Sequence, residues 1–323
     1  MTLRTPVCDL LGIDVPVGSA GMGGGTAGPA LAAAVSNAGG LGCLGGVSRR
    51  GPDGLRDDIR RTRELTSRPF SVNLWVHFLD RFPLLLDVCI EERVPSVTLS
   101  FGAPGEHARR AKDAGLLVLH QVQTLAGAKD ALAGGAVDVL IAQGGEAGGH
   151  TGSVATMALV PAVVDVAGAT PVLAAGGIAD GRGLAAALAL GAQGAVLGTR
   201  FVAAAEATPP AHAHQQRIID ATPDDTVFTD VFDIVDAIPW PPGISGRSVR
   251  TPFSDEWHGR EDELRRRRDA ILAESPVPDE APERAHSAYA GQSAGLIRDV
   301  RPAAAIIAEI VAEAEAVIAG LAR

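Results

Sequence analysis

The chain has 323 residues and a formal net charge of −10, and 46% of its residues are hydrophobic although only 4% are aromatic. This length suits one large α/β domain, or a barrel with a smaller appended region, whose core is built mainly from Ala, Val, Leu and Ile. The acidic balance argues against a surface that binds nucleic acid.

From the N-terminus onward, the chain alternates between short apolar runs and helical segments. The apolar runs are typical of strands buried on both faces, and we expect them at 15–20, 41–44, 70–74, 96–100, 116–120, 137–142, 171–175 and 194–198. Helices are expected between them at 29–37, 53–66, 84–93, 106–114, 124–133, 157–166 and 180–190. Eight strands separated by helices predict an α/β fold, a (β/α)8 TIM barrel over residues 1–207, with catalytic residues at the C-terminal ends of its strands.

The character of the sequence changes after residue 207. Several prolines punctuate a region that also holds Phe228, Phe232 and Trp240, so we expect a smaller C-terminal lid or cap subdomain over residues 208–300. Apolar residues then recur at helical spacing, which predicts that residues 301–323 form a helix packed on the barrel.

The loop after the expected sixth strand, residues 143–152, is unusually rich in glycine. Five of its ten residues are Gly, and glycine is kept where φ must be positive or where a ligand must touch the backbone. Its side chains that could do chemistry are Gln143, Glu146 and His150, and an imidazole suits proton transfer near neutral pH. The alternative interpretation is a tight surface turn with a solvated histidine.

Two further glycine clusters, 176–181 and 198–200, follow the expected seventh and eighth strands. In a barrel the backbone amides of these two loops commonly bind phosphate. Residues 23–28 fit the G-x-G-x-x-G pattern, but no acidic residue follows at the distance that a dinucleotide site needs. His212 and His214 could suggest a metal; without further ligands in register, we interpret them as surface residues and expect no metal.

The cellular location can also be predicted from sequence features. Cys8, Cys43 and Cys89 are odd in number and far apart, with neither a disulfide framework nor a metal-binding spacing. The N-terminal residues lack the apolar core of a signal peptide, and the most apolar region, 155–205, is interrupted by Pro, Asp and Arg. We therefore expect a cytoplasmic protein without a membrane partner.

Several of these stretches resemble a known family. The motif 143–150 (Gln-Gly-Gly-Glu-Ala-Gly-Gly-His), the loops 174–181 and 197–201, and the segment 289–297 are similar to those of the nitronate monooxygenases, formerly called 2-nitropropane dioxygenases. The resemblance implies an FMN-dependent TIM barrel with His150 as the catalytic base. It also implies FMN contacts at Ala20, Gly21, Met22, Asn73, Gln143, Gly148, Gly149, Gly176, Gly177, Gly198 and Thr199, and a substrate pocket closed by Tyr289, Gln292 and Ser293.

The activity that this resemblance implies is the oxidation of alkyl nitronates by O2 to a carbonyl compound and nitrite. His150 would remove the α-proton of neutral nitroalkanes, and Glu146 would fix the loop. One alternative on the same scaffold is an NAD(P)H-dependent FMN reductase of enoyl thioesters or quinones; another is a non-catalytic flavin- or phosphate-binding barrel. We expect small-molecule partners and a monomer or homodimer. Gly21, where the family usually has Pro, and the long stretch 233–253 depart from the family pattern.

Overall fold

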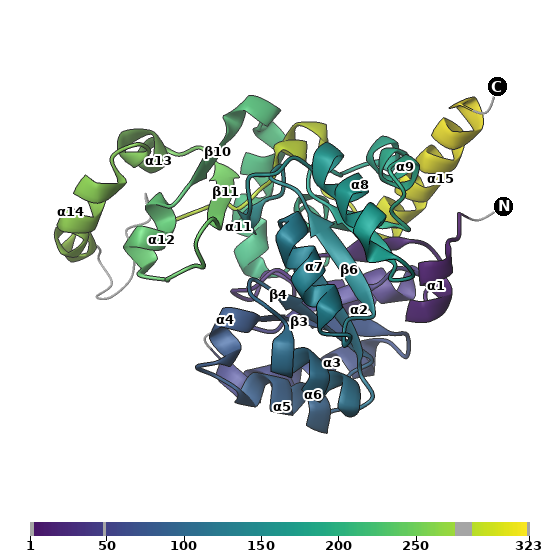
Figure 1. Ribbon diagram of the computed structural model, residues 1–323. Coiled ribbons are helices and arrows are strands. Elements are labelled where there is room, and N and C mark those ends of the chain that lie inside the picture. Colours follow the sequence, from purple (N-terminus) through teal and green to yellow (C-terminus); the bar gives the residue numbers. More distant parts are fainter. Residues whose placement is uncertain (1–2, 48–49, 275–285, 322–323) are drawn as a thin grey trace.

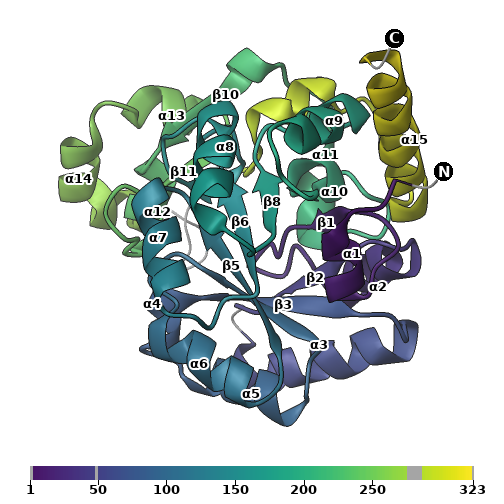
Figure 2. The ribbon, with the colours of Figure 1, turned by 45° about the vertical axis from the view of Figure 1, so that its right-hand side comes forward.

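The computed structural model describes residues 3–47, 50–274 and 286–321. Positions 1–2, 48–49, 275–285 and 322–323, which fall within the expected barrel, lid and C-terminal helix, lie outside the described residues. Eight parallel strands form one sheet in the order β1-β9-β8-β6-β5-β4-β3-β2. A parallel bridge between Gly18 and Leu41 joins β1 to the chain entering β2, so the sheet closes and the predicted TIM barrel is confirmed (Figure 2).

The strands of the barrel lie within or next to the expected apolar runs. They are β1 (Val17–Ser19), β2 (Gly42–Gly45), β3 (Phe70–Trp75), β4 (Ser96–Ser100), β5 (Leu117–Val122), β6 (Val139–Gln143), β8 (Val172–Ala175) and β9 (Ala195–Leu197). The helices around them are α1 (Pro6–Leu11), α2 (Pro29–Asn37), α3 (Gly51–Leu65), α4 (Val76–Leu79), α5 (Leu84–Glu91), α6 (Gly105–Asp113), α7 (Leu125–Ala133), α8 (Thr156–Ala167), α9 (Gly181–Ala189) and α10 (Thr199–Val202). The short α1, α4 and α10 were not expected, because four to six residues are too few to show a helical period.

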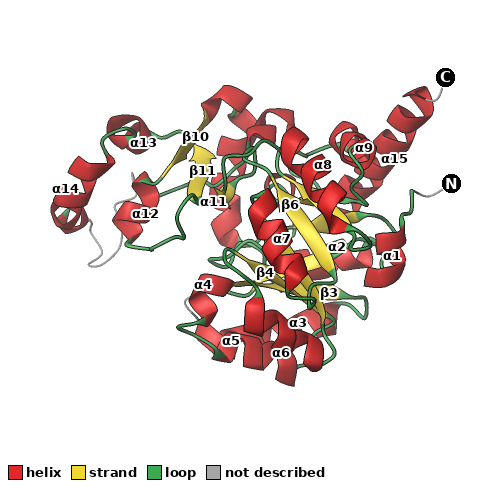
Figure 3. Ribbon diagram, in the orientation of Figure 1, coloured by secondary structure: helices red, strands yellow, loops and turns green. Residues whose placement is uncertain are grey.

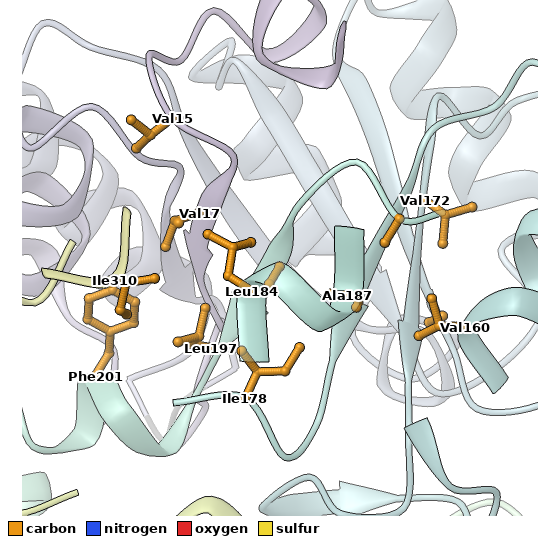
Figure 4. Close-up of a cluster of buried hydrophobic side chains, with 14 of the residues drawn as sticks. Val15, Val17, Val160, Val172, Ile178, Leu184, Ala187, Leu197, Phe201 and Ile310 are labelled. Atoms are coloured by element: carbon orange, nitrogen blue, oxygen red, sulfur yellow. The ribbon is translucent and has the colours of Figure 1, made fainter. Parts of the chain in front are cut away.

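Two apolar layers hold the barrel together. Inside it, side chains from the neighbouring strands β5, β6, β8 and β9 pack with Val7, Cys8 and Leu11 of α1, which plugs the end where the strands begin. Outside it, Val, Leu, Ile and Ala side chains fill the space between strands and helices (Figure 4). The C-terminal helix α15 (Ala303–Leu321) joins this outer layer, with Ile310 beside Phe201, and packs against α9 and α2.

A second, antiparallel sheet stands beside the barrel (Figures 1 and 3). Its strand order is β10-β11-β7, with β10 (Thr226–Thr229), β11 (Ser245–Val249) and β7 (Gly149–Thr151). Three helices accompany it, namely α12 (Val231–Asp236), α13 (Pro252–Trp257) and α14 (Glu261–Ala273), and their apolar faces form a separate cluster around Phe232, Phe253 and Trp257. We call β10, β11 and α12–α14 the lid unit. Because β7 belongs to the glycine-rich loop, this barrel loop supplies a strand to the lid sheet.

The remaining segments connect the barrel to the lid unit and the lid unit back to the barrel. They are α11 (Pro209–Asp220), the 3-10 turns η1 (Pro223–Asp225) and η3 (Gln292–Leu296), and the segment before α15. On α11, His212 is exposed, as expected, but His214 is half-buried and its Nδ1 has no hydrogen-bond partner within the described part of the chain, so His214 is not the surface residue that the sequence indicated. Among the described residues, no helix combines the length and apolarity needed to cross a bilayer.

His120, in β5, is a buried histidine that makes stability depend on pH. Burial lowers its pKa to about 4, and its Nδ1 has no hydrogen-bond partner among the residues that the structure describes. Because the unfolded chain takes up this proton below about pH 6.5 whereas the folded chain resists it down to about pH 4, stability falls as pH drops through that window. The free energy of unfolding should fall between pH 7 and pH 4, and we expect this fall to be about 3 kcal/mol smaller in His120→Gln than in the wild type. His212→Gln is the exposed control; identical pH slopes for wild type and His120→Gln would contradict the assignment.

Candidate functional site

The glycine-rich loop lies at the C-terminal mouth of the barrel, where β6 ends. Glycine on both sides lets this loop and the segment at Gly291 touch through their backbones. A Cβ added to Gly148 would lie 2.4 Å from the nitrogen of Gly291, and one added to Gly291 would lie 2.5 Å from the carbonyl oxygen of Glu146. The segment after the lid therefore packs directly on this loop, and Gln292 N donates a hydrogen bond to Glu146 O of the loop (3.0 Å). The neighbouring amide, Gly291 N, donates to Thr199 Oγ1 at the start of α10 (3.0 Å).

His150 sits in β7, between the barrel and the lid unit. Its Nε2 lies 2.8 Å from Oδ1 of Asp233 on α12, and the two side chains are only 9% and 10% exposed. The indole of Trp240 stacks on the imidazole, with ring centroids 3.5 Å apart and planes 13° apart. The ring of Tyr289 lies 5.2 Å away on another side. His150 is thus enclosed by residues of the lid and the following segment, which excludes the solvated turn considered from sequence.

Asp233 was not predicted as a site residue. It stands 83 positions after His150, in the sequence Val-Phe-Asp-Ile-Val-Asp of α12. The sequence did hold a signal for it, because Asp233 stands among apolar residues that are buried on a short helix. A buried carboxylate is uncommon and is usually paired with a positively charged or hydrogen-bonding group. The sequence could not name its partner, because the pair forms only through the β7–β11 ladder, in which His150 lies opposite Gly246.

A set of amide side chains fixes the backbone of His150 from the barrel side. Gln143 accepts hydrogen bonds at Oε1 from Nε2 of Gln121 and of Gln123, both 2.9 Å long. Its own Nε2 donates to the carbonyl oxygen of His150 at 3.2 Å. Because each buried amide of this set is engaged, the position of His150 is set by the ends of β5 and β6 as well as by the lid.

Asn73 and Gly21 meet across the mouth of the barrel. Asn73 is buried and donates to Ser100 Oγ at 2.7 Å and to the carbonyl oxygen of Thr98 at 3.2 Å. A Cβ at position 21 would lie 2.1 Å from Cβ of Asn73, so neither Pro nor any other side chain fits there without a shift. This contact is a physical reason for the glycine that departs from the family pattern. Ala20 and Met22, on either side, are half-buried at the same rim.

The two glycine loops after β8 and β9 are neighbours, because these strands pair in the barrel. Gly176 and Gly177 have φ of +99° and +73°, which side chains rarely adopt. A Cβ added to Gly198 would meet only Ala20 at 3.6 Å, and one added to Gly149 would meet nothing within 4 Å, so backbone faces open space at both positions. This cradle of amides fits an anionic group such as the phosphate of a flavin mononucleotide.

Glu146, the acidic side chain of the glycine-rich loop, has a structural contact. One of its carboxylate oxygens accepts hydrogen bonds from both N and Oγ1 of Thr156, each 2.8 Å long, at the first residue of α8. A carboxylate at a helix N-terminus is stabilised by the free amides there. It therefore ties the loop to α8, as the sequence interpretation expected of a loop-fixing residue.

An aromatic wall surrounds the stacked pair. Trp240 contacts Trp75, His77 and Phe101 at centroid distances of 5.0, 4.9 and 5.0 Å. Phe101 has a φ of +60°, which is unusual for a bulky residue, and its carbonyl oxygen lies 3.3 Å from His77 Nδ1. Burial lowers the pKa of His77, an effect partly offset by this hydrogen bond, so the wall is uncharged at neutral pH.

The sequence and the fold are similar to those of several known proteins. The family described as nitronate monooxygenase matches residues 4–83 and 78–313. A Rhodococcus jostii relative, "(3aS,4S,5R,7aS)-5-hydroxy-7a-methyl-1-oxo-octahydro-1H-indene-4-carboxyl-CoA dehydrogenase", is 42% identical over 230 residues; the match covers 71% of this chain and spans only 64% of that relative's length.

Two solved structures resemble the fold along almost its whole length. FabK from Thermotoga maritima has a TM-score of 0.86 and 40% identity, with 99% of each chain covered. Nitroalkane oxidase from Streptomyces ansochromogenes has a TM-score of 0.81 and 30% identity, with 98% of this chain and 99% of the other covered. The barrel and the lid unit are therefore shared with both structures.

Proposed function

This chain belongs to the nitronate monooxygenase family of flavin-dependent oxidoreductases, and on that premise we propose that it oxidises alkyl nitronates with O2, giving a carbonyl compound and nitrite. Neutral nitroalkanes enter the same reaction after His150 removes their α-proton. The observation that carries the proposal is the buried His150–Asp233 pair, held under Trp240 at the C-terminal mouth of a barrel beside two glycine loops.

FMN is the cofactor that we propose for this site. The amides of Gly176, Gly177, Gly198 and Thr199 would hold its phosphate, because the two loops face each other after paired strands. The ring contacts that we propose are the rim and loop residues Ala20, Gly21, Met22, Asn73, Gln143, Gly148 and Gly149. When bound, FMN supplies the redox chemistry, and the protein supplies position and electrostatics.

His150 contributes acid–base chemistry in this proposal. As a neutral imidazole it accepts the α-proton of a nitroalkane, and the electron pair of the broken C–H bond moves onto the nitro group, which yields the nitronate anion. The resulting imidazolium lies between the carboxylate of Asp233 and the nitronate, so both anions stabilise it. The stacked Trp240 keeps water from the ring while this happens.

The substrate pocket that we propose is bordered by Tyr289, Gln292 and Ser293. Burial, and then the charge of Asp233, raise the pKa of the Tyr289 hydroxyl well above its usual range, so this hydroxyl stays protonated beside the Asp233 carboxylate. A hollow of about 490 Å³ lies beside Asp233 and is lined mainly by the segment 237–245, which includes Trp240 and links α12 to β11. We propose residues 1–207 as the FMN barrel, 208–300 as the lid and 301–323 as a helix packed on the barrel.

A second function is favoured by the comparisons. The FabK structure is 40% identical to this chain and covers 99% of it, and the Rhodococcus relative is named as a dehydrogenase of a carboxyl-CoA thioester. On the same scaffold, NAD(P)H would supply electrons for the reduction of an enoyl thioester or a quinone, and His150 would deliver a proton. A buried acid–base pair argues against the third possibility, a non-catalytic flavin-binding barrel, because such a pair is costly to bury without a use.

One experiment separates these functions. The flavin-loaded protein is mixed anaerobically with NADH, NADPH, 2-nitropropane or its nitronate while the flavin spectrum is recorded, and O2 is then admitted. Bleaching by the nitronate and release of nitrite support the first function. Bleaching by NADH or NADPH alone, followed by reoxidation with an enoyl thioester, supports the second. No spectral change with any of them supports the non-catalytic barrel.

We further propose a cytoplasmic enzyme, monomeric or homodimeric, whose partners are small molecules and O2 and include neither nucleic acid nor a membrane. The net charge of −10 supports the exclusion of nucleic acid. Size-exclusion chromatography with light scattering tests the oligomeric state, and a mass above that of a dimer would contradict it.

A further inference from the structure

We propose that Asp233 is the positioning residue of the base: it fixes the tautomer of His150, with the proton on Nε2 and the lone pair on Nδ1, and thereby makes base catalysis depend on the lid unit. This inference rests on the proposed role of His150. The 2.8 Å contact joins Nε2 to Oδ1 of Asp233, and an ionised carboxylate only accepts hydrogen bonds. Nε2 must therefore carry the hydrogen, which leaves Nδ1 of the neutral ring to accept a proton from substrate.

The lid unit holds Asp233 firmly in this place. Its neighbours on α12, Val231, Phe232 and Val235, are at most 2% exposed and form the lid's apolar cluster with α13 and α14. Arg268 of α14 donates from Nε to the carbonyl oxygens of Ile234 and Val235 at 3.1 and 3.0 Å, which anchors the end of α12. The carboxylate is thus presented by a packed helix, and its position moves only if the lid unit moves.

The two members of the pair come from different parts of the molecule. His150 belongs to the barrel's own loop, and Asp233 belongs to α12 of the lid unit. They meet because β7 and β11 pair, with His150 opposite Gly246, and because Gly246 has no side chain: a Cβ there would lie 2.9 Å from the Tyr289 ring and 3.5 Å from His150 Nε2. Docking of the lid onto the barrel loop therefore assembles the base.

The chemical consequence is specific to proton abstraction. When Nδ1 takes the α-proton, the ring becomes a cation, and the carboxylate 2.8 Å from Nε2 stabilises this charge in a site that excludes most water. Without the carboxylate, the ring can also place its hydrogen on Nδ1, and that tautomer cannot accept a proton from substrate. A preformed nitronate needs no proton removal, so its oxidation depends on Asp233 much less.

The test compares Asp233→Asn, Asp233→Glu and Asp230→Asn in the flavin-loaded full-length protein. Asp230 is a matched control because it precedes α12 and borders the same hollow, but its side chain makes no capping hydrogen bond. We expect Asp233→Asn to lower kcat for neutral 2-nitropropane about 10²-fold or more, within the range of general-base catalysis, with little change in KM. We expect less than about tenfold change with the nitronate, partial recovery in Asp233→Glu, and wild-type rates in Asp230→Asn.

A readout independent of turnover separates this inference from the proposed function. In protein labelled with ¹⁵N-histidine, the ring signals of His150 are identified by their absence in His150→Asn. We expect a protonated Nε2 and an unprotonated Nδ1 in the wild type and in Asp230→Asn, and a mixture of tautomers in Asp233→Asn. Absence of nitroalkane turnover in the wild type, with this signature intact, would overturn only the proposed function. An unchanged tautomer in Asp233→Asn, or equal losses with nitroalkane and nitronate, would overturn the role of Asp233.

Discussion

Replacement of His150 by Asn is expected to lower the rate with a neutral nitroalkane by about 10²–10⁴-fold, while the rate with the preformed nitronate changes far less. The reason is that asparagine keeps a polar side chain under Trp240 but has no nitrogen that can take up a proton. The measurement is kcat/KM for 2-nitropropane and for its nitronate, together with the flavin content of the purified variant. Flavin should be retained, because the proposed phosphate contacts lie in the loops after β8 and β9.

The control for this experiment is His212→Asn, a change at an exposed histidine of α11 away from the site. It should leave both rates unaltered. Equal losses with nitroalkane and nitronate would mean that His150 acts through anion binding or through the structure of β7, and the base assignment would then be wrong. If neither rate changed, the nitronate function would lose its support, and the enoyl reductase would become the better explanation.

The barrel could be predicted from the sequence because its signals are local. Each strand is a short apolar run bounded by turn residues, and each helix repeats its own period, so no distant contact is needed to recognise them. The boundaries of the elements were less predictable than their existence. A strand is expected over 15–20, but β1 covers only Val17–Ser19, because its length is set by its pairing with β9. Closure of the sheet between Gly18 and Leu41 follows from the count of eight strands.

The lid sheet could not be predicted in the same way. β7 is the tripeptide Gly-His-Thr, which has neither an apolar run nor a β-rich composition, and it becomes a strand only through its pairing with β11 almost one hundred residues later. For the same reason, the sequence indicated His150 but not Asp233, and it indicated Trp240 only as part of an aromatic group. The cofactor contacts that rest on the family resemblance, such as those of Gly176 and Gly198, stay predictions.

The second large effect is expected at Gly177, where a change to Leu should strongly weaken flavin binding. Gly177 has a φ of +73°, and an added Cβ would lie 3.3 Å from Cβ of Glu146, so a leucine there would strain the backbone, crowd Glu146 and shift the amides that we propose for the phosphate. Loss of those hydrogen bonds to a charged group should weaken FMN binding by at least about 10²-fold, equivalent to about 2.7 kcal/mol. The measurement is FMN affinity by fluorescence quenching of the apoprotein.

Backbone strain alone could also weaken binding, and Gly115→Leu controls for it. Gly115 has a φ of +84° and lies between α6 and β5, at the opposite end of the barrel, where an added Cβ meets nothing within 4 Å. Both variants incur the cost of a left-handed backbone, about 1–2 kcal/mol of stability. Only Gly177→Leu should lose FMN, and Gly115→Leu should bind FMN as the wild type does. FMN bound normally by Gly177→Leu would place the phosphate elsewhere, because a leucine at this position leaves no room for an anion against the loop after β8.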